Sequence, residues 1–152
     1  MVLKEYKNKR NFSKTPEPKN NRQSTVANNK SLYVIQRHDA SHLHYDLRLE
    51  IDGVLKSWAI PKIPPKTKGL KRLAIQVEDH PLSYAKFEGE IPEGNYGAGK
   101  VEIWDEGTFE IVEKEDKTLV VNIHGKKLNG EYCLVKTHYG SKPEKSWLFF
   151  KR

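Results

Sequence analysis

Residues 32–37, LYVIQR, and residues 43–53, LHYDLRLEIDG, decide the fold of this chain. In the second stretch every other residue from Leu43 to Leu49 is apolar, a period of two that is typical of a β-strand with one buried face. Asp52-Gly53 follows, a dipeptide favoured in the two-residue type I′ turn of a β-hairpin. The stretch therefore predicts a strand that turns back into a second strand.

Short alternating or β-branched runs recur through the rest of the chain, and we expect strands at residues 54–60, 72–78, 100–104, 108–112, 118–123, 131–137 and 146–150. Glu106-Gly107 and Asn129-Gly130 mark two further expected reversals. With a short helix expected within residues 3–10, the pattern predicts a mainly β protein. An antiparallel β-barrel of about eight or nine strands would bury these strands without exposing their edges.

The 152 residues suit one domain, which we divide into a basic N-terminal arm with a flexible connector, residues 1–30, and a barrel, residues 31–152. The arm carries eight Lys or Arg residues against Glu5 and Glu17, which makes it the basic part of a chain of net charge +7. Such an arm indicates contact with a polyanion. No apolar run approaches the length of a membrane span, so we expect a cytoplasmic protein. The single cysteine, Cys133, excludes an internal disulfide and a thiolate zinc cluster.

The opposite face of the strand 43–51 carries a row of polar residues, namely His42, His44, Asp46, Arg48 and Glu50. Residues two apart on one strand face lie about 6.5–7 Å apart, so His44 and Asp46 are able to bind one cation. His38, before the strand, would complete the set. Two imidazoles and a carboxylate suit Mn²⁺, Zn²⁺ or Fe²⁺ and leave positions open for water and substrate. Arg48 is then placed to bind an anionic oxygen.

Other function classes remain open from these residues. His44, Asp46 and the more distant His80 would form the two-histidine, one-carboxylate set of a non-haem iron oxygenase. A non-catalytic nucleic-acid-binding barrel would use only the arm. A nucleotidyltransferase is disfavoured, because Glu50 stands where its Lys-x-Asp-Gly motif needs the lysine nucleophile. The glycine-rich run from Gly89 to Gly99 could hold a phosphate or form a structural turn.

Three blocks of this sequence resemble the 3′-phosphoesterase module of bacterial DNA ligase D, a family that also exists as free-standing proteins. They are RHDASHLHYDLRLEIDGVLKSWAIPK (37–62), VEDHPLSYAKFEGEIPEGNYGAG (77–99) and VEIWDEG (101–107), and the resemblance extends from about Tyr6 to Lys151. It implies a β-barrel hydrolase that depends on Mn²⁺, with Co²⁺ or Zn²⁺ as alternatives, and that trims 3′ ends during DNA end joining. A phosphodiesterase step removes a terminal ribonucleoside from a primer-template, and a phosphomonoesterase step converts the remaining 3′-phosphate to a 3′-OH. A separate ligase and polymerase are implied partners, and we expect a monomer.

The resemblance also assigns residues. His38, His44 and Asp46 would bind the metal, and Arg48, His80 and Tyr84 would surround the phosphate. Further basic positions are Lys62 and Arg72. The family's arm contributes an Arg, an Asp and a Glu to catalysis, which correspond here to Arg10, Asn11 and Glu17. Asn11 departs from the pattern, and an amide lacks the carboxylate's charge, so we expect a weak diesterase step.

Overall fold

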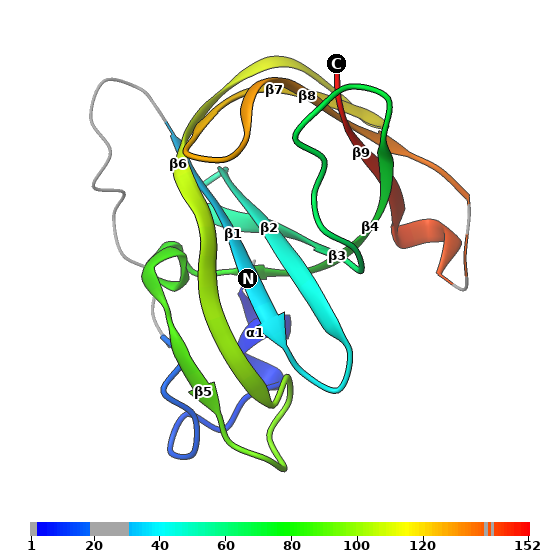
Figure 1. Cartoon of the computed structure of the whole chain (residues 1–152). Helices are drawn as coiled ribbons and strands as arrows, with labels where there is room; N and C mark the ends of the chain where they lie inside the picture. The colour runs from blue at the N-terminus through cyan, green and yellow to red at the C-terminus, as the bar shows by residue number, and fades with distance from the viewer. Residues whose placement is uncertain (1–2, 19–30, 139, 141) are drawn as a thin grey trace.

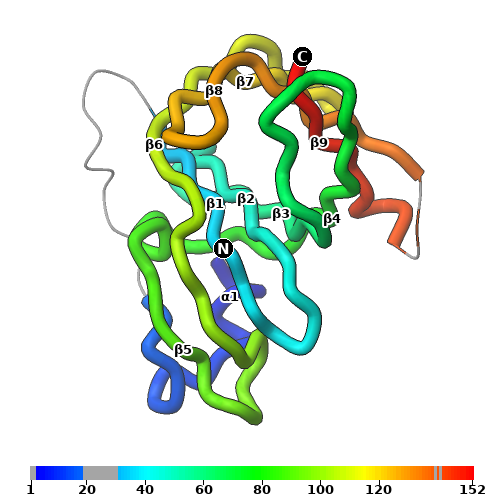
Figure 2. Tube along the Cα trace, viewed as in Figure 1, coloured from blue at the N-terminus to red at the C-terminus, as the bar shows by residue number. Residues whose placement is uncertain are grey.

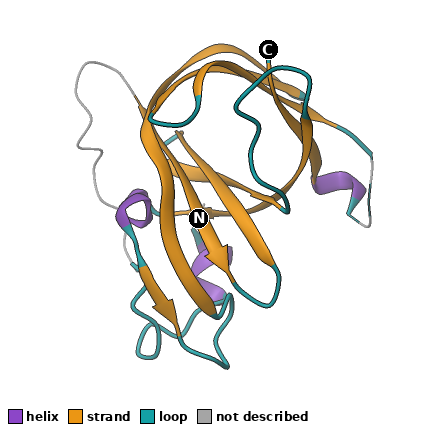
Figure 3. Ribbon diagram, in the orientation of Figure 1, coloured by secondary structure: helices purple, strands orange, loops and turns teal. Residues whose placement is uncertain are grey.

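The structure is a computed structural model that describes residues 3–18, 31–138, 140 and 142–152 (Figure 1). Strands dominate it, and the helical segments are short (Figure 3). The elements in chain order are α1 (Lys4–Asn8), β1 (Ser31–Asp39), β2 (Leu43–Ile51), β3 (Val54–Ile60), β4 (Lys71–His80), the 3₁₀ helix η1 (Leu82–Lys86), β5 (Gly89–Ile91), β6 (Gly99–Glu115), β7 (Thr118–Gly125), β8 (Asn129–Lys136), the 3₁₀ helix η2 (Pro143–Lys145) and β9 (Ser146–Lys151). Within the described part of the chain, no helix has the length and apolar character of a membrane span.

Eight strands close into an antiparallel barrel, which confirms the predicted fold class. They follow the order β1-β2-β3-β4-β9-β8-β7-β6, and pairing of β6 with β1 closes the ring (Figure 2). The short strand β5 adds to the free side of β6 at its beginning, where Gly89 lies opposite Val101. Closure gives almost every strand two hydrogen-bonded neighbours, which removes the exposed edges of an open sheet.

The apolar face of β2 packs inward as its alternation predicts. Tyr45, Leu47 and Leu49 are buried in the barrel core together with Tyr33 and Phe149. Leu43 is the exception, because it begins the strand beside the β1–β2 turn and stays exposed. The Asp52-Gly53 turn is also confirmed, since both residues have the positive φ angles of a type I′ turn, 55° and 78°.

Two of the expected reversals are wrong. Glu106-Gly107 lies inside one long strand, β6. A Cβ atom at position 107 would lie 2.0 Å from the carbonyl oxygen of His124 on β7, so only a glycine fits there. The glycine thus permits close approach of β7 rather than a turn. Asn129-Gly130 begins β8, and the reversal precedes it at residues 126–128.

The polar face of β2 is covered from outside the barrel. The arm folds as predicted into a short helix, α1, whose Tyr6 is fully buried beneath it. Tyr6 belongs to a second apolar cluster with Val34, Leu55 and Tyr84, on the outer side of the sheet. Residues 3–18 therefore form part of the folded body. The flexible connector expected at residues 20–30 lies outside the described residues, so the division between arm and barrel stays a prediction.

Candidate metal and phosphate site

A cleft of about 300 Å³ lies between the arm and the outer face of the barrel. The polar face of β1 and β2 forms its floor, and β4, η1 and the arm form one side. Ile91, Tyr96 and Gly97, from β5 and the glycine-rich run, form the opposite wall. Most of the predicted site residues line this cleft, including His38, His44, Asp46, Arg48, His80, Tyr84, Arg10 and Glu17.

The structure brings His38, His44 and Asp46 together at one end of the cleft. His38 lies directly opposite His44 in the β1–β2 pairing, and Asp46 follows two residues along β2. One ligand atom from each residue lies within 4.8 Å of the others. This spacing suits three ligands of a single cation, as strand phase predicted for two of them.

Hydrogen bonds orient both imidazoles toward Asp46. His38 donates Nε2–H to the Gly97 carbonyl over 2.6 Å, which leaves the lone pair of Nδ1 facing Asp46 Oδ2 at 3.5 Å. His44 donates Nδ1–H to the His42 carbonyl over 3.0 Å, which leaves Nε2 facing Asp46 Oδ1 at 3.2 Å. Metal-binding histidines commonly donate their second N–H to a carbonyl in this way. Lone pairs that face a carboxylate require a proton or a cation between them, so the donor set fits a divalent metal.

The charges of this group favour a cation as well. Burial would raise the pKa of Asp46, but Arg48 and the two histidines outweigh burial and hold that pKa far below its usual range. Burial would lower the pKa of His44, but its hydrogen bond and attraction to Asp46 raise the pKa instead. A metal ion must therefore compete with a proton for His44, so binding weakens as the pH falls.

Arg48 connects the metal-binding group to the rest of the cleft. Its Nη2 lies 3.4 Å from Asp46 Oδ2, and its Nη1 lies 3.3 Å from His80 Nδ1. Its Nε–H donates to Gln36 Oε1 over 2.6 Å, which fixes the plane of the guanidinium group. Each terminal nitrogen keeps a second N–H, and these can meet an anionic oxygen placed beside the metal.

His80 lies deeper in the cleft and is neutral. Burial, followed by the charges of Arg48 and Arg10, holds the pKa of His80 well below 6.5. Its Nδ1–H donates to the Glu78 carbonyl over 3.0 Å, and its Nε2 accepts from Arg10 Nη2 over 3.3 Å. Among the described residues the metal-binding group contains His38 rather than His80, which disfavours the ligand set of an iron oxygenase.

The arm places Arg10 beside His80 and Glu17 beside Tyr84. Arg10 Nε donates to Glu17 Oε2 over 2.9 Å, and Tyr84 donates its hydroxyl hydrogen to the same oxygen over 2.7 Å. Arg10 Nη1 also lies 3.1 Å from Glu78 Oε2. The buried side chains of the arm and barrel are thus joined by ionic hydrogen bonds, which are stronger than neutral ones.

Two residues that sequence reasoning missed hold this arrangement. Gln36 is fully buried, accepts from Arg48, and donates to the carbonyl oxygens of Tyr84 and Phe87 over 2.8 and 3.1 Å. Glu78 is buried and binds Arg10 and Lys9. Both lie in predicted strands, at positions that face outward from the barrel. A polar residue at such a position was the signal in the sequence that could have identified them as part of the site.

Lys62, Arg72 and Asn11 do not line the cleft. Lys62 is exposed in the β3–β4 loop, and Arg72 donates its Nε–H to the Ile63 carbonyl over 2.8 Å at the start of β4. Neither lines the cleft, so their contact with substrate remains a prediction. Asn11 is exposed beside the cleft, where its side-chain oxygen accepts from the N–H and hydroxyl of Ser13 over 3.2 and 2.7 Å.

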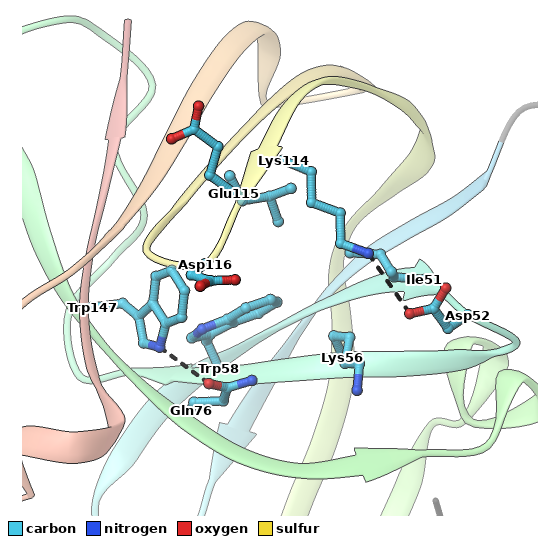
Figure 4. Close-up of a pocket in the computed structure, with 10 residues that line it drawn as sticks. Ile51, Asp52, Lys56, Trp58, Gln76, Lys114, Glu115, Asp116 and Trp147 are labelled. Atoms are coloured by element: carbon cyan, nitrogen blue, oxygen red, sulfur yellow. Dashed lines mark hydrogen bonds and ion pairs between the residues drawn. The ribbon is translucent and has the colours of Figure 1, made fainter.

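A larger cavity of about 390 Å³ lies at the opposite end of the barrel, away from the histidines (Figure 4). Trp58 and Trp147 form its floor, and Asp52, Glu115 and Asp116 lie around its mouth. It holds no candidate metal group, since among the described residues only the cleft has one. We therefore place the chemistry in the smaller cleft.

Comparisons with known proteins point to one family. A family model described as the DNA ligase D 3′-phosphoesterase domain matches residues 36–136. The chain is 46% identical over 154 residues to the multifunctional non-homologous end joining protein LigD of Pseudomonas aeruginosa, covering 98% of this chain and 18% of that protein. It is 48% identical over 140 residues to the multifunctional non-homologous end joining DNA repair protein LigD of Mycobacterium tuberculosis, covering 90% and 18%. The chain thus spans about a fifth of the length of these relatives.

Proposed function

Because this chain belongs to the DNA ligase D 3′-phosphoesterase domain family, we propose that its cleft hydrolyses phosphate esters at the 3′ ends of nucleic-acid strands during DNA end joining. The observation that carries the proposal is the position of Arg48, which contacts both Asp46 of the metal-binding group and His80. A phosphate held there would meet a cation on one side and a guanidinium group on the other. Both stabilise the charge that develops on its oxygens.

The resident metal is Mn²⁺, with Co²⁺ or Zn²⁺ as replacements, on His38, His44 and Asp46. Imidazole nitrogens and a carboxylate suit all three ions, and no thiolate selects zinc alone. When bound, such a cation supplies Lewis-acid charge and lowers the pKa of water.

The protein's own side chains then bind and orient the ester. The free N–H groups of Arg48 bind a non-bridging oxygen, and Gln36 keeps the guanidinium group in place. Arg10 lies on the far side of His80, so it binds the ester oxygen or the next phosphate along the strand. Tyr84 packs its ring 4.8 Å from the Arg48 guanidinium carbon and restricts movement of that group.

His80 donates the proton to the leaving oxygen. In the free protein, burial together with the field of two arginines keeps the imidazole neutral. A bound phosphate offsets that field, so the pKa of His80 rises when substrate is present. The imidazole then acts as an acid in the complex.

The substrates are primer-templates whose 3′ end carries either one ribonucleotide or a 3′-phosphate. Hydrolysis of the diester releases a nucleoside and leaves a 3′-phosphate, and hydrolysis of the monoester leaves a 3′-OH. These products are what a polymerase and a ligase require, so such enzymes, on separate chains or as further domains, are the expected partners. In this proposal the protein acts as a monomer, and the residues that line the cleft lie on one chain.

The test uses a 5′-labelled primer on a DNA template with each type of 3′ end, in the presence of Mn²⁺. We expect both ends to be processed, and His44→Ala to lose at least a hundredfold in rate. His42→Ala is the matched control, because His42 is exposed and contributes only its backbone carbonyl to the site. The proposal fails if wild-type protein leaves both ends unchanged, or if His44→Ala is as active as wild type.

A non-catalytic nucleic-acid-binding barrel makes a different prediction. It would bind the primer-template equally well in EDTA and with His44→Ala, and it would process neither end. The buried, oriented ligand set has no role in such a protein, so we favour the enzyme.

A further inference from the structure

Five lysines surround one end of the barrel, and together we call them the lysine platform. Lys66 and Lys68 lie in the β3–β4 loop, Lys126 and Lys127 in the β7–β8 turn, and Lys151 ends β9. All but the half-buried Lys151 are exposed. Among the described residues, no carboxylate lies within 4.0 Å of any of these ammonium groups.

Contacts between the three segments show that they form one surface. Lys127 Nζ lies 4.5 Å and Lys66 Nζ 5.9 Å from the ring centre of the same residue, Trp104. Tyr132, near the start of β8, donates its hydroxyl hydrogen to a carbonyl of the β3–β4 loop over 2.8 Å, and Lys151 Nζ lies 6.0 Å from the Tyr132 ring. The loop and the β7–β8 turn approach each other across this end of the barrel (Figure 1).

A buried carboxylate fixes the turn and forms no ion pair with the lysines of the platform. Asp105 accepts the backbone N–H groups of Lys126, Lys127 and Leu128 over 2.8, 3.0 and 3.0 Å, as well as the Tyr33 hydroxyl over 2.8 Å. Its oxygens are thus occupied inside the barrel, while the lysine side chains extend into solvent. Lys66 and Lys127, which share Trp104, carry like charges that repel each other, and a polyanion would relieve the repulsion.

The opposite end of the barrel carries charges of both signs. There Lys114 pairs with Asp52 over 3.7 Å, while Glu115 and Asp116 line the mouth of the larger cavity (Figure 4). The chain has a net charge of +7 and residues 1–30 carry +6 of it, so the barrel is nearly neutral as a whole. The five lysines are therefore a local concentration of positive charge on a nearly neutral barrel.

The lysine platform is at the same end of the barrel as the metal-binding group. Connections between successive strands of an antiparallel barrel alternate between its two ends. The β1–β2 turn, which joins the strands of His38 and His44, therefore leaves from the same end as the β3–β4 loop, the β7–β8 turn and the end of β9.

We propose that the lysine platform binds the phosphate backbone of the nucleic-acid duplex behind the 3′ end that enters the cleft. This inference rests on the proposed function for the identity of the polyanion. Unpaired lysines position a duplex by contacts to phosphates, which need no base sequence and release bound counterions.

The test measures binding of a fluorescent blunt DNA duplex with 3′-OH ends, in EDTA, across a range of salt concentrations. The double variant Lys66→Gln with Lys127→Gln should bind at least about fivefold more weakly at low salt. The slope of log Kd against log salt should fall by roughly 1.8, about 0.9 for each lost phosphate contact. The matched control is Lys117→Gln with Lys145→Gln, since both are exposed, free of ion pairs with described residues, and at the opposite end. Thermal unfolding of each variant checks that it folds.

The outcomes separate this inference from the proposed function. Equal affinity and equal salt slope for the platform variant and wild type would overturn the inference, and so would absence of duplex binding by wild type. If wild type still processes 3′ ends in either of these cases, the inference about the platform fails and the proposed function stands. If the platform variant loses binding but wild type hydrolyses neither end, the platform stands and the phosphoesterase proposal falls.

Discussion

Tyr84 of η1 donates its hydroxyl hydrogen to Glu17 of the arm over 2.7 Å, and both side chains are buried. Burial, together with the neighbouring carboxylate, holds the pKa of Tyr84 well above its usual value, so the hydroxyl stays protonated as a donor. The bond joins two segments far apart in sequence and closes one side of the cleft. Anything that breaks it should loosen the arm.

The first prediction concerns this bond. Tyr84→Phe keeps the ring but removes the donor to a buried charge, which should lower the free energy of unfolding by about 1.5–3 kcal/mol. Urea denaturation in EDTA measures this. Tyr132→Phe is the control, because its hydroxyl donates to the neutral Pro65 carbonyl, and it should cost only about 1 kcal/mol. Wild-type stability in Tyr84→Phe would contradict the account of the arm.

The second prediction concerns Gln36. Gln36→Met preserves the approximate volume but leaves the Nε–H of Arg48 and two carbonyl oxygens without their partner. We expect a loss of about 1–3 kcal/mol in the free energy of unfolding. We also expect a fall in kcat of at least tenfold, because Arg48 is no longer held in plane. Steady-state kinetics on a 3′-phosphate end measure the latter.

The control for Gln36 is Gln76→Met. Gln76 accepts the Trp147 indole N–H over 3.1 Å at the far end of the barrel. It should lose stability without a change in kcat. Equal kcat values for both variants would show that Gln36 does not position Arg48.

The third prediction concerns Asn11→Asp. The carboxylate retains the acceptor oxygen for Ser13, so the free energy of unfolding should change by less than about 0.5 kcal/mol. Nucleoside release from a ribonucleotide-terminated primer should rise severalfold, while hydrolysis of a 3′-phosphate should stay the same. An unchanged ratio of the two rates would remove the argument that Asn11 limits the diesterase step.

The fourth prediction is a pH dependence of stability through Glu78. Burial alone would raise its pKa, but hydrogen bonding to its own backbone N–H and the charges of Arg10 and Lys9 hold the pKa below 4.5. The unfolded chain therefore takes up this proton first as the pH falls. The contribution of Glu78 is complete above about pH 4.5 and is lost as the pH falls through the folded-state pKa.

Glu78→Gln should accordingly flatten the acid side of the stability curve below pH 5. Chemical denaturation of wild type and variant at several pH values, in EDTA, measures the slope. Asp79→Asn is the neighbouring control, since Asp79 pairs with the half-buried Lys56 rather than with the arm. A Glu78→Gln curve as steep as that of wild type would exclude Glu78 as a source of the dependence.

Much of this protein was determined by the sequence alone. Alternation in residues 43–51 and the Asp52-Gly53 turn predicted the hairpin, and the same alternation placed His44, Asp46 and Arg48 on one face, because successive side chains of a strand point to opposite sides. His38 was added to them as the residue that would complete the metal-binding set, and the resemblance of the quoted blocks to a known family supplied Tyr84, Arg10, Glu17 and the phosphate-binding role of His80. The local geometry of a strand is sufficient to place side chains on one face, since that geometry depends only on neighbours along the chain.

Tertiary structure decided the rest. Gly107 looked like a turn residue, and only the approach of the His124 carbonyl shows why a glycine is needed inside β6. Burial of Gln36 and Glu78 depends on the arm folding back over the outer face of the barrel, a contact between residues about 70 positions apart for Arg10 and Glu78. The neutral state of His80 likewise results from its burial and from two arginines on different segments. Electrostatic fields and burial depend on distance in space, so the pattern of residues along the chain could not reveal them.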